Sequence, residues 1–133
     1  MRSHSDVFTD PLTPVVFLER TLRVYPGRTA LVHGERRETY AEFGERVGRM
    51  AGALQRAGIA PGDRVAVLAP NTPHALAAAF AAPLIQAPLV AVNTRLAAAE
   101  IAYILRHSGA RVLLVDPELA PPLRVNLQAQ VAT

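Results

Sequence analysis

The sequence predicts an α/β fold of the three-layer type, in which a parallel sheet with βαβ units is preceded by an N-terminal helix and a β-hairpin. Three short apolar runs predict the strands of the sheet, at 65–69, 89–92 and 112–115. Runs this short, with turn signals beside them, are typical of strands buried on both faces of a parallel sheet. Two helical segments alternate with the three runs, which indicates two right-handed βαβ units.

A helix and a hairpin are expected before the sheet. Thr13 is a good N-cap, and Pro14 suits the first helical position that follows it. Residues at helical spacing then form one face, and Pro26-Gly27 ends the helix. The residues of that face are Phe17, Leu18, Thr21, Leu22 and Tyr25. Two extended runs, 29–33 and 36–40, surround Gly34-Glu35 and predict a β-hairpin.

The best-specified helix begins at Thr39. Thr39 and Glu42 have the spacing of a capping box, in which each side chain accepts a hydrogen bond from a backbone N–H group. Gly58 is expected as a left-handed stop, with Ile59 folding back on Leu54 in a Schellman arrangement. The apolar face is expected to contain Phe43, Val47, Met50 and Leu54. Gly44, Gly48 and Gly52 recur every four residues on the same helix and predict a close-packing face.

The stretch from Gly62 to Pro73 organises the rest of the chain. Its apolar run is followed by Asn71 and Thr72, both good N-caps, and by Pro73, which suits the first turn of a helix. The segment is therefore expected to be a strand, a tight loop and a helix. In open α/β sheets, the loops that follow such strands are where ligands usually bind.

The later elements follow the same alternation. Residues 97–107 are expected to be helical, with Ser108-Gly109 closing the helix and Asp116-Pro117 ending the last strand. The face of this helix that we expect to be buried contains Ile101, Ile104 and Leu105.

Composition excludes several classes of site. Half of the 133 residues are hydrophobic, which indicates one ordered domain. The absence of cysteine excludes disulfides, thiolate metal sites and a cysteine nucleophile. All 14 basic residues are arginine, so a phosphate-binding Gly-x-x-x-x-Gly-Lys loop is impossible. The serines are Ser3, Ser5 and Ser108, and none lies in a nucleophile elbow.

Charge and hydropathy indicate neither nucleic acid nor a membrane. The arginines are interleaved with acidic residues and leave a net charge of +3, which favours a solvated surface over a nucleic-acid footprint. The most apolar segment, 75–92, is interrupted by Pro83, Gln86 and Pro88, which favours a buried helix and strand over a membrane span. The first residues carry no apolar signal-peptide core, so we expect a cytoplasmic protein.

Side chains that could carry chemistry are few and scattered. The histidines His4, His33, His74 and His107 lie far apart and form no metal-ligand pattern, so no metal site is expected. Glu38, Glu42 and Glu45 are expected to be helix-start charges, and no catalytic residue is expected. Arg95 stands out because it lies in the exit loop 93–96, where a guanidinium can bind a phosphate or carboxylate. Spacing alone also allows a structural arginine that fixes this loop.

Several segments, taken together, resemble a known family. They are Tyr25–Val32, Thr39–Phe43, Gly62–Asn71, Asn93–Leu96 and the stretch from Ile101–Leu105 to Asp116. In order and spacing they resemble the N-terminal part of acyl-CoA synthetases. These enzymes belong to the adenylate-forming (AMP-binding) family, which also contains luciferases and peptide-synthetase adenylation domains. The resemblance runs from about residue 13 to about residue 120.

The resemblance implies a two-step acid:CoA ligase acting on fatty or related carboxylic acids. An acid and ATP with Mg²⁺ give an acyl-adenylate and pyrophosphate, and the thiol of coenzyme A then displaces AMP. The family's Ser/Thr/Gly-rich loop with its lysine, its acid-pocket residues, its adenylate-binding aspartate and its C-terminal catalytic lysine are absent from this chain. We therefore expect an N-terminal fragment, the incomplete first subdomain of the large N-terminal domain, that is inactive alone and binds no cofactor tightly. Arg95 matches the arginine of the family's Asn-x-Arg-Leu block, which implies a contact with a phosphate of coenzyme A.

Two departures from the family pattern concern local structure. Ala97-Ala98-Ala99 precede Glu100 where related sequences often have a Ser/Thr-Pro-Glu helix start, and losing the cap hydroxyl should cost about 1 kcal/mol. Before Leu89 the family tends to have glycines, whereas this chain has Ala82, Gln86 and Ala87. We expect these replacements to disturb the packing of the turn.

The expected domain organisation is a flexible N-terminus over 1–12, a partial adenylate-forming domain over 13–120, and a loose tail over 121–133. The apolar strand 112–115 would lie at an unfinished sheet edge, so we expect the isolated chain to aggregate or to be molten. Two alternatives remain: a self-standing, non-catalytic α/β binding module with a cooperative fold, and an arginine-driven nucleic-acid binder with salt-sensitive affinity.

Overall fold

The computed structural model describes residues 12–120, and the predicted α/β class is confirmed within this range. The expected flexible N-terminus and the expected tail from residue 121 lie outside the described residues, apart from Leu12. In chain order the elements are α1 (Pro14–Val24), β1 (Thr29–His33), β2 (Arg36–Thr39), α2 (Tyr40–Arg56), β3 (Arg64–Leu68), α3 (Pro73–Leu84), β4 (Leu89–Ala91), α4 (Ala98–Ser108), β5 (Ala110–Val115) and the 3₁₀ turn η1 (Pro117–Leu119).

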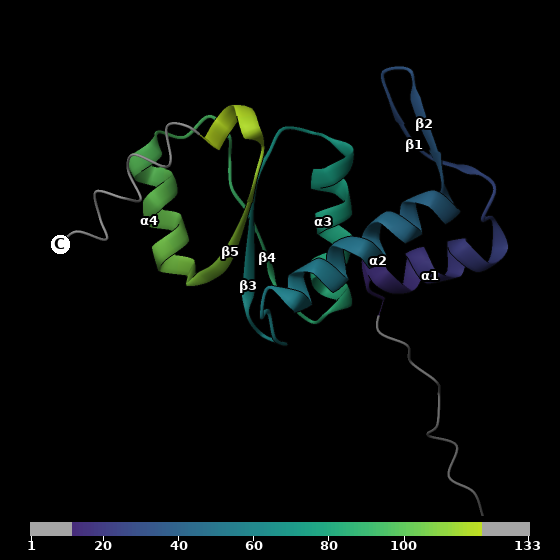
Figure 1. Cartoon of the computed structure of the whole chain (residues 1–133), viewed down its shortest axis with the longest axis horizontal. Coiled ribbons are helices and arrows are strands. Elements are labelled where there is room, and N and C mark those ends of the chain that lie inside the picture. The colour runs from purple at the N-terminus through teal and green to yellow at the C-terminus, as the bar shows by residue number, and fades with distance from the viewer. Residues whose placement is uncertain (1–11, 121–133) are drawn as a thin grey trace, which may run out of the picture.

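A three-stranded parallel sheet forms the middle layer, in the order β4-β3-β5. Figure 1 shows α4 on one side of this sheet and α2 and α3 on the other. Side chains alternate accordingly along β3: Val65 packs into the cluster that includes α2 and α3, while Ala66 and Leu68 pack into the cluster that includes Ile101 of α4. The connection from β3 to β4 moves across the sheet in one direction, and the connection from β4 to β5 moves back in the other. When both connections are right-handed, their helices α3 and α4 must therefore lie on opposite faces.

The predicted helix signals are found at the expected residues. Thr39 and Glu42 form the capping box of α2, in which Thr39 N–H donates to Glu42 Oε2 at 2.7 Å. At the other end of α2 Gly58 has a φ of +85°, and Ile59 N–H donates to Leu54 O at 3.1 Å, as a Schellman motif requires. Thr72 caps α3 by accepting from Ala75 N–H at 3.3 Å, and Pro73 occupies the first turn.

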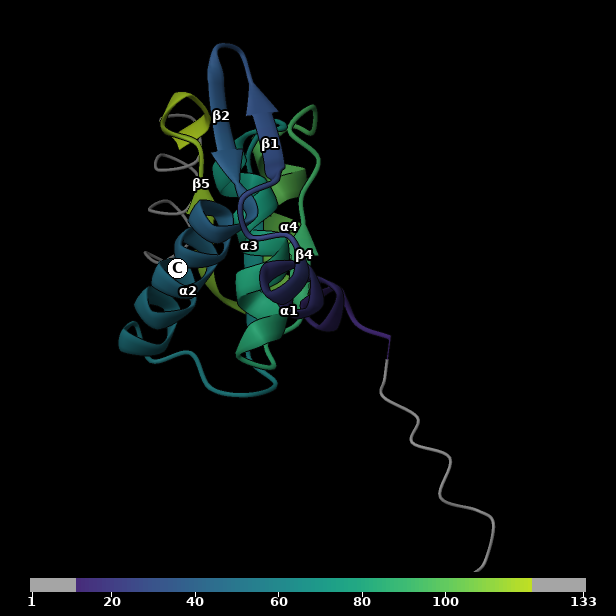
Figure 2. The same ribbon diagram turned by 90° about the vertical axis from the view of Figure 1, so that its right-hand side faces the viewer.

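The β-hairpin is confirmed, with His33 paired to Arg36 across the two-residue turn Gly34-Glu35. Gly34 has a φ of +59°, which a glycine adopts at little cost in the first central position of such a turn. Figures 1 and 2 show the hairpin projecting beyond the end of α2.

A buried ion pair ties the hairpin to α2, and it corrects the interpretation of Glu38 as a helix-start charge. Glu38 lies in β2 and its side chain is 5% exposed. Arg46 of α2 donates from Nε to Glu38 Oε2 at 3.0 Å and makes a second bond to Oε1, while Arg36 Nε lies 2.7 Å from Oε1. The hydrogen bond from Arg46 is the largest cause that holds the pKa of Glu38 below its ordinary value.

Burial is less complete than the apolar pattern indicates on β4, β5 and α1, and residues 112–115 of β5 are only partly buried. β4 is only partly buried and Ala91 is exposed, because β4 lies at the edge of the sheet and has a single neighbouring strand. On α1, Leu18 is buried but Phe17 and Tyr25 are exposed. Helices α2 and α3 cover only part of α1, so its predicted face is wider than the covered one.

The glycine series of α2 does not form a continuous close-packing face. A Cβ at Gly44 would lie 2.6 Å from Cδ2 of Leu22, so α1 and α2 do approach closely at this position. A Cβ at Gly48 would meet nothing within 4 Å, and one at Gly52 would meet only the Arg56 side chain. The close approach is confined to Gly44 because α1 crosses α2 near that turn.

Candidate functional site

The three parallel strands end at one edge of the sheet, where the loops 69–72 and 92–97 and the start of η1 lie together. Hydrogen bonds beyond the strands hold these loops in place: Val92 N–H donates to Val67 O at 2.9 Å, and Asp116 N–H donates to Leu68 O at 2.9 Å. Asp116 then accepts the N–H of Glu118 at 3.0 Å and begins η1. This is the edge at which open α/β sheets place their ligands.

Asn93 shapes the loop that carries Arg95. Its side-chain oxygen accepts the backbone N–H of Arg95 at 2.9 Å, which is the hydrogen bond of an Asx turn. The side chain of Arg95 is exposed, and among the described residues its guanidinium has no hydrogen bond or ion pair. The loop is therefore fixed by Asn93, and the guanidinium is available to an anionic group.

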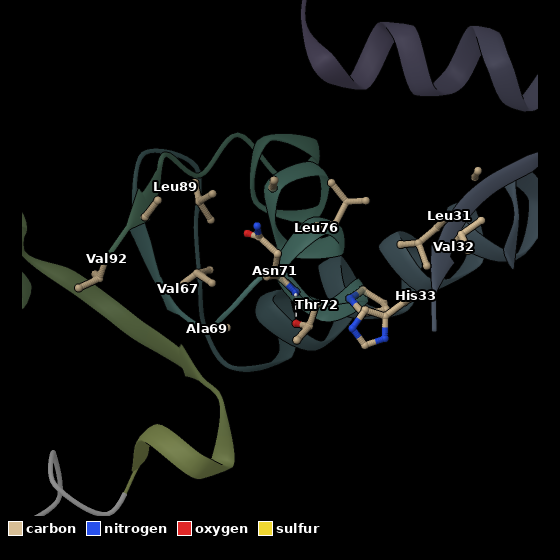
Figure 3. A pocket seen from close by; sticks show the side chains of 15 residues that line it. Leu31, Val32, His33, Val67, Ala69, Asn71, Thr72, Leu76, Leu89 and Val92 are labelled. Atoms are coloured by element: carbon tan, nitrogen blue, oxygen red, sulfur yellow. Dashed lines mark hydrogen bonds between the residues drawn. The ribbon is translucent and has the colours of Figure 1, made fainter. Parts of the chain in front are cut away.

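A hollow of about 590 Å³ lies between the hairpin and this edge (Figure 3). Leu31, Val32 and His33 approach it from the hairpin, while Val67, Ala69, Leu89 and Val92 line it from the sheet and its loops. Leu76 of α3 stands between the two groups, and Asn71 and Thr72 supply the polar atoms of the loop after β3. The lining contains no charged residue, so the hollow suits an apolar occupant.

A second hollow of about 250 Å³ adjoins the first and shares four lining residues with it, Val67, Ala69, Thr72 and Ala75. Thr72, His74 and Asp116 are its polar residues, and Met50, Ala78 and Leu114 are among its apolar ones. Arg95 lines neither hollow, so the structure does not bring the predicted anion-binding residue into either of them.

The histidines are dispersed, as expected. His33 and His74 line different hollows, and His107 stacks on Tyr103 of α4 with ring centroids 5.5 Å apart. His4 lies outside the described residues. Between residues 12 and 120 no group of three or more histidine, aspartate or glutamate side chains could hold a metal ion.

Two charged residues of the Gly62–Asn71 segment have structural partners. Arg64 donates from Nε to Ser108 O at 2.9 Å and from a terminal nitrogen to Gly109 O at 2.8 Å, so it closes the C-terminus of α4. Asp63 accepts the Ala60 N–H at 2.9 Å and an Arg111 nitrogen at 2.8 Å. The Ala60 N–H and then Arg111 hold the pKa of Asp63 below its ordinary value. Both residues stabilise the strand ends opposite to the candidate ligand edge.

The hairpin side of the hollow was not predicted. Nothing in residues 29–33 indicates that they would face the loop after β3, because the two segments are separated in the sequence by the whole of α2. An acidic residue in the middle of a short strand, with an arginine eight positions later on a predicted helix, is the one available signal.

None of the helices within residues 12–120 is long and apolar enough to cross a membrane.

Comparison with known proteins gives one family. The model of the AMP-binding enzyme family matches residues 18–133. A peroxisomal butyrate–CoA ligase of Arabidopsis thaliana is 42% identical over 111 residues, which are 84% of this chain and 19% of that protein. A peroxisomal trans-cinnamate:CoA ligase of Petunia hybrida is 40% identical over 123 residues, which are 92% of this chain and 22% of that protein. The chain thus spans about a fifth of the length of the curated relatives it matches.

Solved structures agree with this result. An anthranilate CoA ligase in complex with anthranoyl-AMP has a TM-score of 0.82 and 31% identity, and the match covers 86% of this chain and 22% of that one. The inhibitor-bound N-terminal domain of FACL13 from Mycobacterium tuberculosis has a TM-score of 0.81 and 35% identity, covering 86% of this chain and 29% of that one. The solved structures and the family model therefore agree on the fold and the family of this chain.

Proposed function

Since the chain belongs to the AMP-binding enzyme family, we propose that it supplies the N-terminal part of an ATP-dependent acid:CoA ligase. The reaction would be adenylation of a carboxylic acid with release of pyrophosphate, followed by transfer of the acyl group to the thiol of coenzyme A. The observation that carries this proposal is the family match over residues 18–133, supported by relatives whose names are those of acid–CoA ligases.

We propose that a fatty or related carboxylic acid is the substrate. The named relatives act on butyrate and on trans-cinnamate, which are both monocarboxylic acids with an apolar body. We propose the cytoplasm as the compartment. Relatives named as peroxisomal make the peroxisome the alternative that localisation of the tagged protein would reveal.

This chain would not catalyse the reaction alone. It has no lysine, and among the described residues the loop after β3, 69–72, contains no glycine to approach a triphosphate. The residues present therefore do not fit an ATP and Mg²⁺ site, and we assign them no step that involves ATP.

Arg95 fits a different task, a contact with a phosphate of coenzyme A. Its guanidinium is exposed, has no partner among the described residues, and lies in a loop that the Asn93 side chain fixes. A guanidinium binds phosphate through paired, charge-assisted hydrogen bonds. The Arg95 side chain would hold the nucleotide end of coenzyme A and leave the thiol free to move.

A chimeric ligase tests the proposal. In the Arabidopsis butyrate–CoA ligase, the segment that this chain matches is replaced by the chain itself, and acid-dependent ATP–pyrophosphate exchange and acyl-CoA formation are measured separately. We expect both activities. A folded chimera that lacks pyrophosphate exchange would refute the ligase assignment.

The same chimera tests Arg95. Arg95→Ala should raise the KM for coenzyme A about 10-fold, the equivalent of one lost charged hydrogen bond, and leave pyrophosphate exchange unchanged. Arg23→Ala, which removes an exposed arginine from the last turn of α1, is the matched control. Equal effects of the two substitutions on this KM would eliminate the phosphate contact.

We also propose that the isolated chain self-associates. β5 pairs with β3 on one side only, and no described residue pairs with its other edge, which carries the apolar residues 112–115. Unprotected apolar edges add further strands. Sedimentation velocity should show the mean mass rising from low to high micromolar concentration, and a monomer throughout this range would contradict the proposal.

A further inference from the structure

An apolar face extends across α1, β1 and α3, of which α3 is distant in sequence from the other two. The 590 Å³ hollow between the hairpin and the sheet edge continues into a smaller one of about 220 Å³, lined by α1, α2, α3 and the hairpin. Ala30 and Leu76 line both hollows, so the two are continuous. We call this surface the α1–β1–α3 face and define it by its three exposed large side chains, Phe17, Val32 and Leu76.

The face is unlike an ordinary solvated surface. Phe17 is 56% exposed, Val32 55% and Leu76 42%. No aspartate, glutamate or arginine lines either hollow, although 25 such residues occur in the chain. Contiguous apolar patches of this kind mark interaction sites, and depletion of charge is typical of the buried centre of an interface. The partner that covers this face should therefore present an apolar protein surface of its own.

The comparisons indicate what that surface is. The N-terminal domain of FACL13 forms a solved structure without the remainder of its protein, and this chain matches 29% of it at a TM-score of 0.81. In that domain the matched part is accompanied by more than twice as much further chain. A domain has one shared hydrophobic core, so large apolar surfaces on one part are expected to be covered by another.

We propose that the α1–β1–α3 face is the docking surface for the further part of an adenylate-forming N-terminal domain, with Leu76 at its centre. The proposal rests on the family assignment that also underlies the proposed function, and it adds a partner and a contact residue. Docking covers Leu76 from both hollows at once, because that side chain lines both of them. It also fixes the hairpin, since Val32 lies on the same face.

The chain offers a matched pair of substitutions on one helix. Leu76 and Leu84 both belong to α3 and are 42% and 41% exposed. Leu84 lines neither of the hollows that make up the α1–β1–α3 face. Aspartate at either position should be nearly harmless while the side chain is solvated, and aspartate at a covered position would be an unpaired buried charge.

The experiment uses a chimera in which this full chain replaces the matching segment of the FACL13 N-terminal domain. We expect a cooperative thermal transition, with Leu76→Asp lowering the midpoint by about 5 to 10 °C and Leu84→Asp lowering it by less than half as much. Equal shifts for the two substitutions would overturn the proposal, and so would a chimera without a cooperative transition. A dimeric chimera that Leu76→Asp renders monomeric without changing the midpoint would instead assign the face to a second copy.

Melting requires neither an acid nor ATP nor coenzyme A, so the result is independent of catalysis. A chimera that melts as expected while the butyrate–CoA ligase chimera is inactive would support the docking surface and refute the ligase assignment. An active butyrate–CoA ligase chimera, together with equal midpoint shifts for Leu76→Asp and Leu84→Asp, would support the ligase assignment and refute the docking surface.

Discussion

Replacing Glu38 with glutamine tests whether a buried ion pair holds the hairpin to α2. The side chains of Glu38 and Arg46 are 5% and 13% exposed, and Glu38 also accepts from Arg36. Glutamine keeps the size of the side chain but removes the charge, which leaves the Arg46 cation buried without a counter-ion. Breaking one partner of a buried pair costs roughly 3 to 5 kcal/mol, and because glutamine retains one acceptor we expect about 3 kcal/mol.

The same helix provides a control in which an ion pair lies in water. Glu45 and Arg49 are 71% and 69% exposed and their charged atoms are 3.3 Å apart. Exposed pairs of this kind contribute at most about 0.5 kcal/mol to stability, so Glu45→Gln should hardly change the free energy of unfolding. Urea unfolding followed by circular dichroism, at the lowest concentration that gives a signal, measures both variants.

A third variant separates the ion pair from simple packing. Replacing Glu38 and Arg46 together by methionine removes both charges and keeps most of the volume, so it should recover more than half of the stability lost in Glu38→Gln. Glu38→Gln and Glu45→Gln with equal unfolding midpoints would show that the buried pair does not hold the hairpin. Failure of the double substitution to recover stability would show that the loss has another cause.

Four further predictions concern α2, the two helix ends noted as departures from the family, and pH. Gly48→Ala should stabilise the chain by about 0.5 to 1 kcal/mol because its Cβ would enter open space, whereas Gly44→Ala should gain less or lose stability, as urea midpoints will show. Gln86 has a φ of +60°, so Gln86→Gly should shift the urea midpoint upward by the equivalent of about 1 kcal/mol; no shift would mean that the left-handed backbone is unstrained. Ala97 caps α4 without a side-chain acceptor, so Ala97→Ser should raise the thermal midpoint by the equivalent of about 1 kcal/mol, and a lower midpoint would refute it. The folded-state pKa of Glu38 lies below its ordinary value of 4.5. The stability that the charged Glu38 contributes is complete above pH 4.5 and is lost as the pH falls through the lower, folded-state pKa. In Glu38→Gln the free energy of unfolding should therefore depend less on pH between these two limits, as urea unfolding at a series of acidic pH values will show.

Local sequence rules were sufficient to predict where several helices begin and end. The capping box at Thr39 and the left-handed Gly58 depend only on residues a few positions apart, and both were predicted to the residue. The N-cap at Thr72 followed from the same kind of argument. Such features are set by backbone hydrogen bonds that neighbouring side chains satisfy or leave open.

Burial depended on contacts that no local pattern contains. Glu38 resembled a helix-start charge because its sequence neighbours are polar, and only the fold brings Arg46 and Arg36 to it. The turn before Leu89 shows the converse case. Gln86 is exposed, so its polar side chain is not buried in the turn, and the departure from glycine leaves a non-glycine residue at positive φ.

The candidate site was predictable in part. The position of Arg95 in a loop at the carboxyl edge followed from the strand pattern, and its role as a phosphate contact stays a prediction. The hollow beside the edge was not predictable, because the hairpin that forms its far wall is separated in sequence from β3 by the whole of α2.

Because β3 is central in the sheet and also the earliest of its three strands, synthesis and sheet assembly proceed in a compatible order. The ribosome releases β3 before either of its neighbours, and β4 and then β5 can each add to an edge that already exists. The hydrophobic residues of β3 stay unpaired until these strands emerge. In the interval α2, the longest described helix, which emerges just before β3, can cover one face of it. A nascent chain paused between β3 and β4 would therefore expose one face of β3 more than the other, and a chaperone that recognises apolar segments would find its target on the face that α4 later covers.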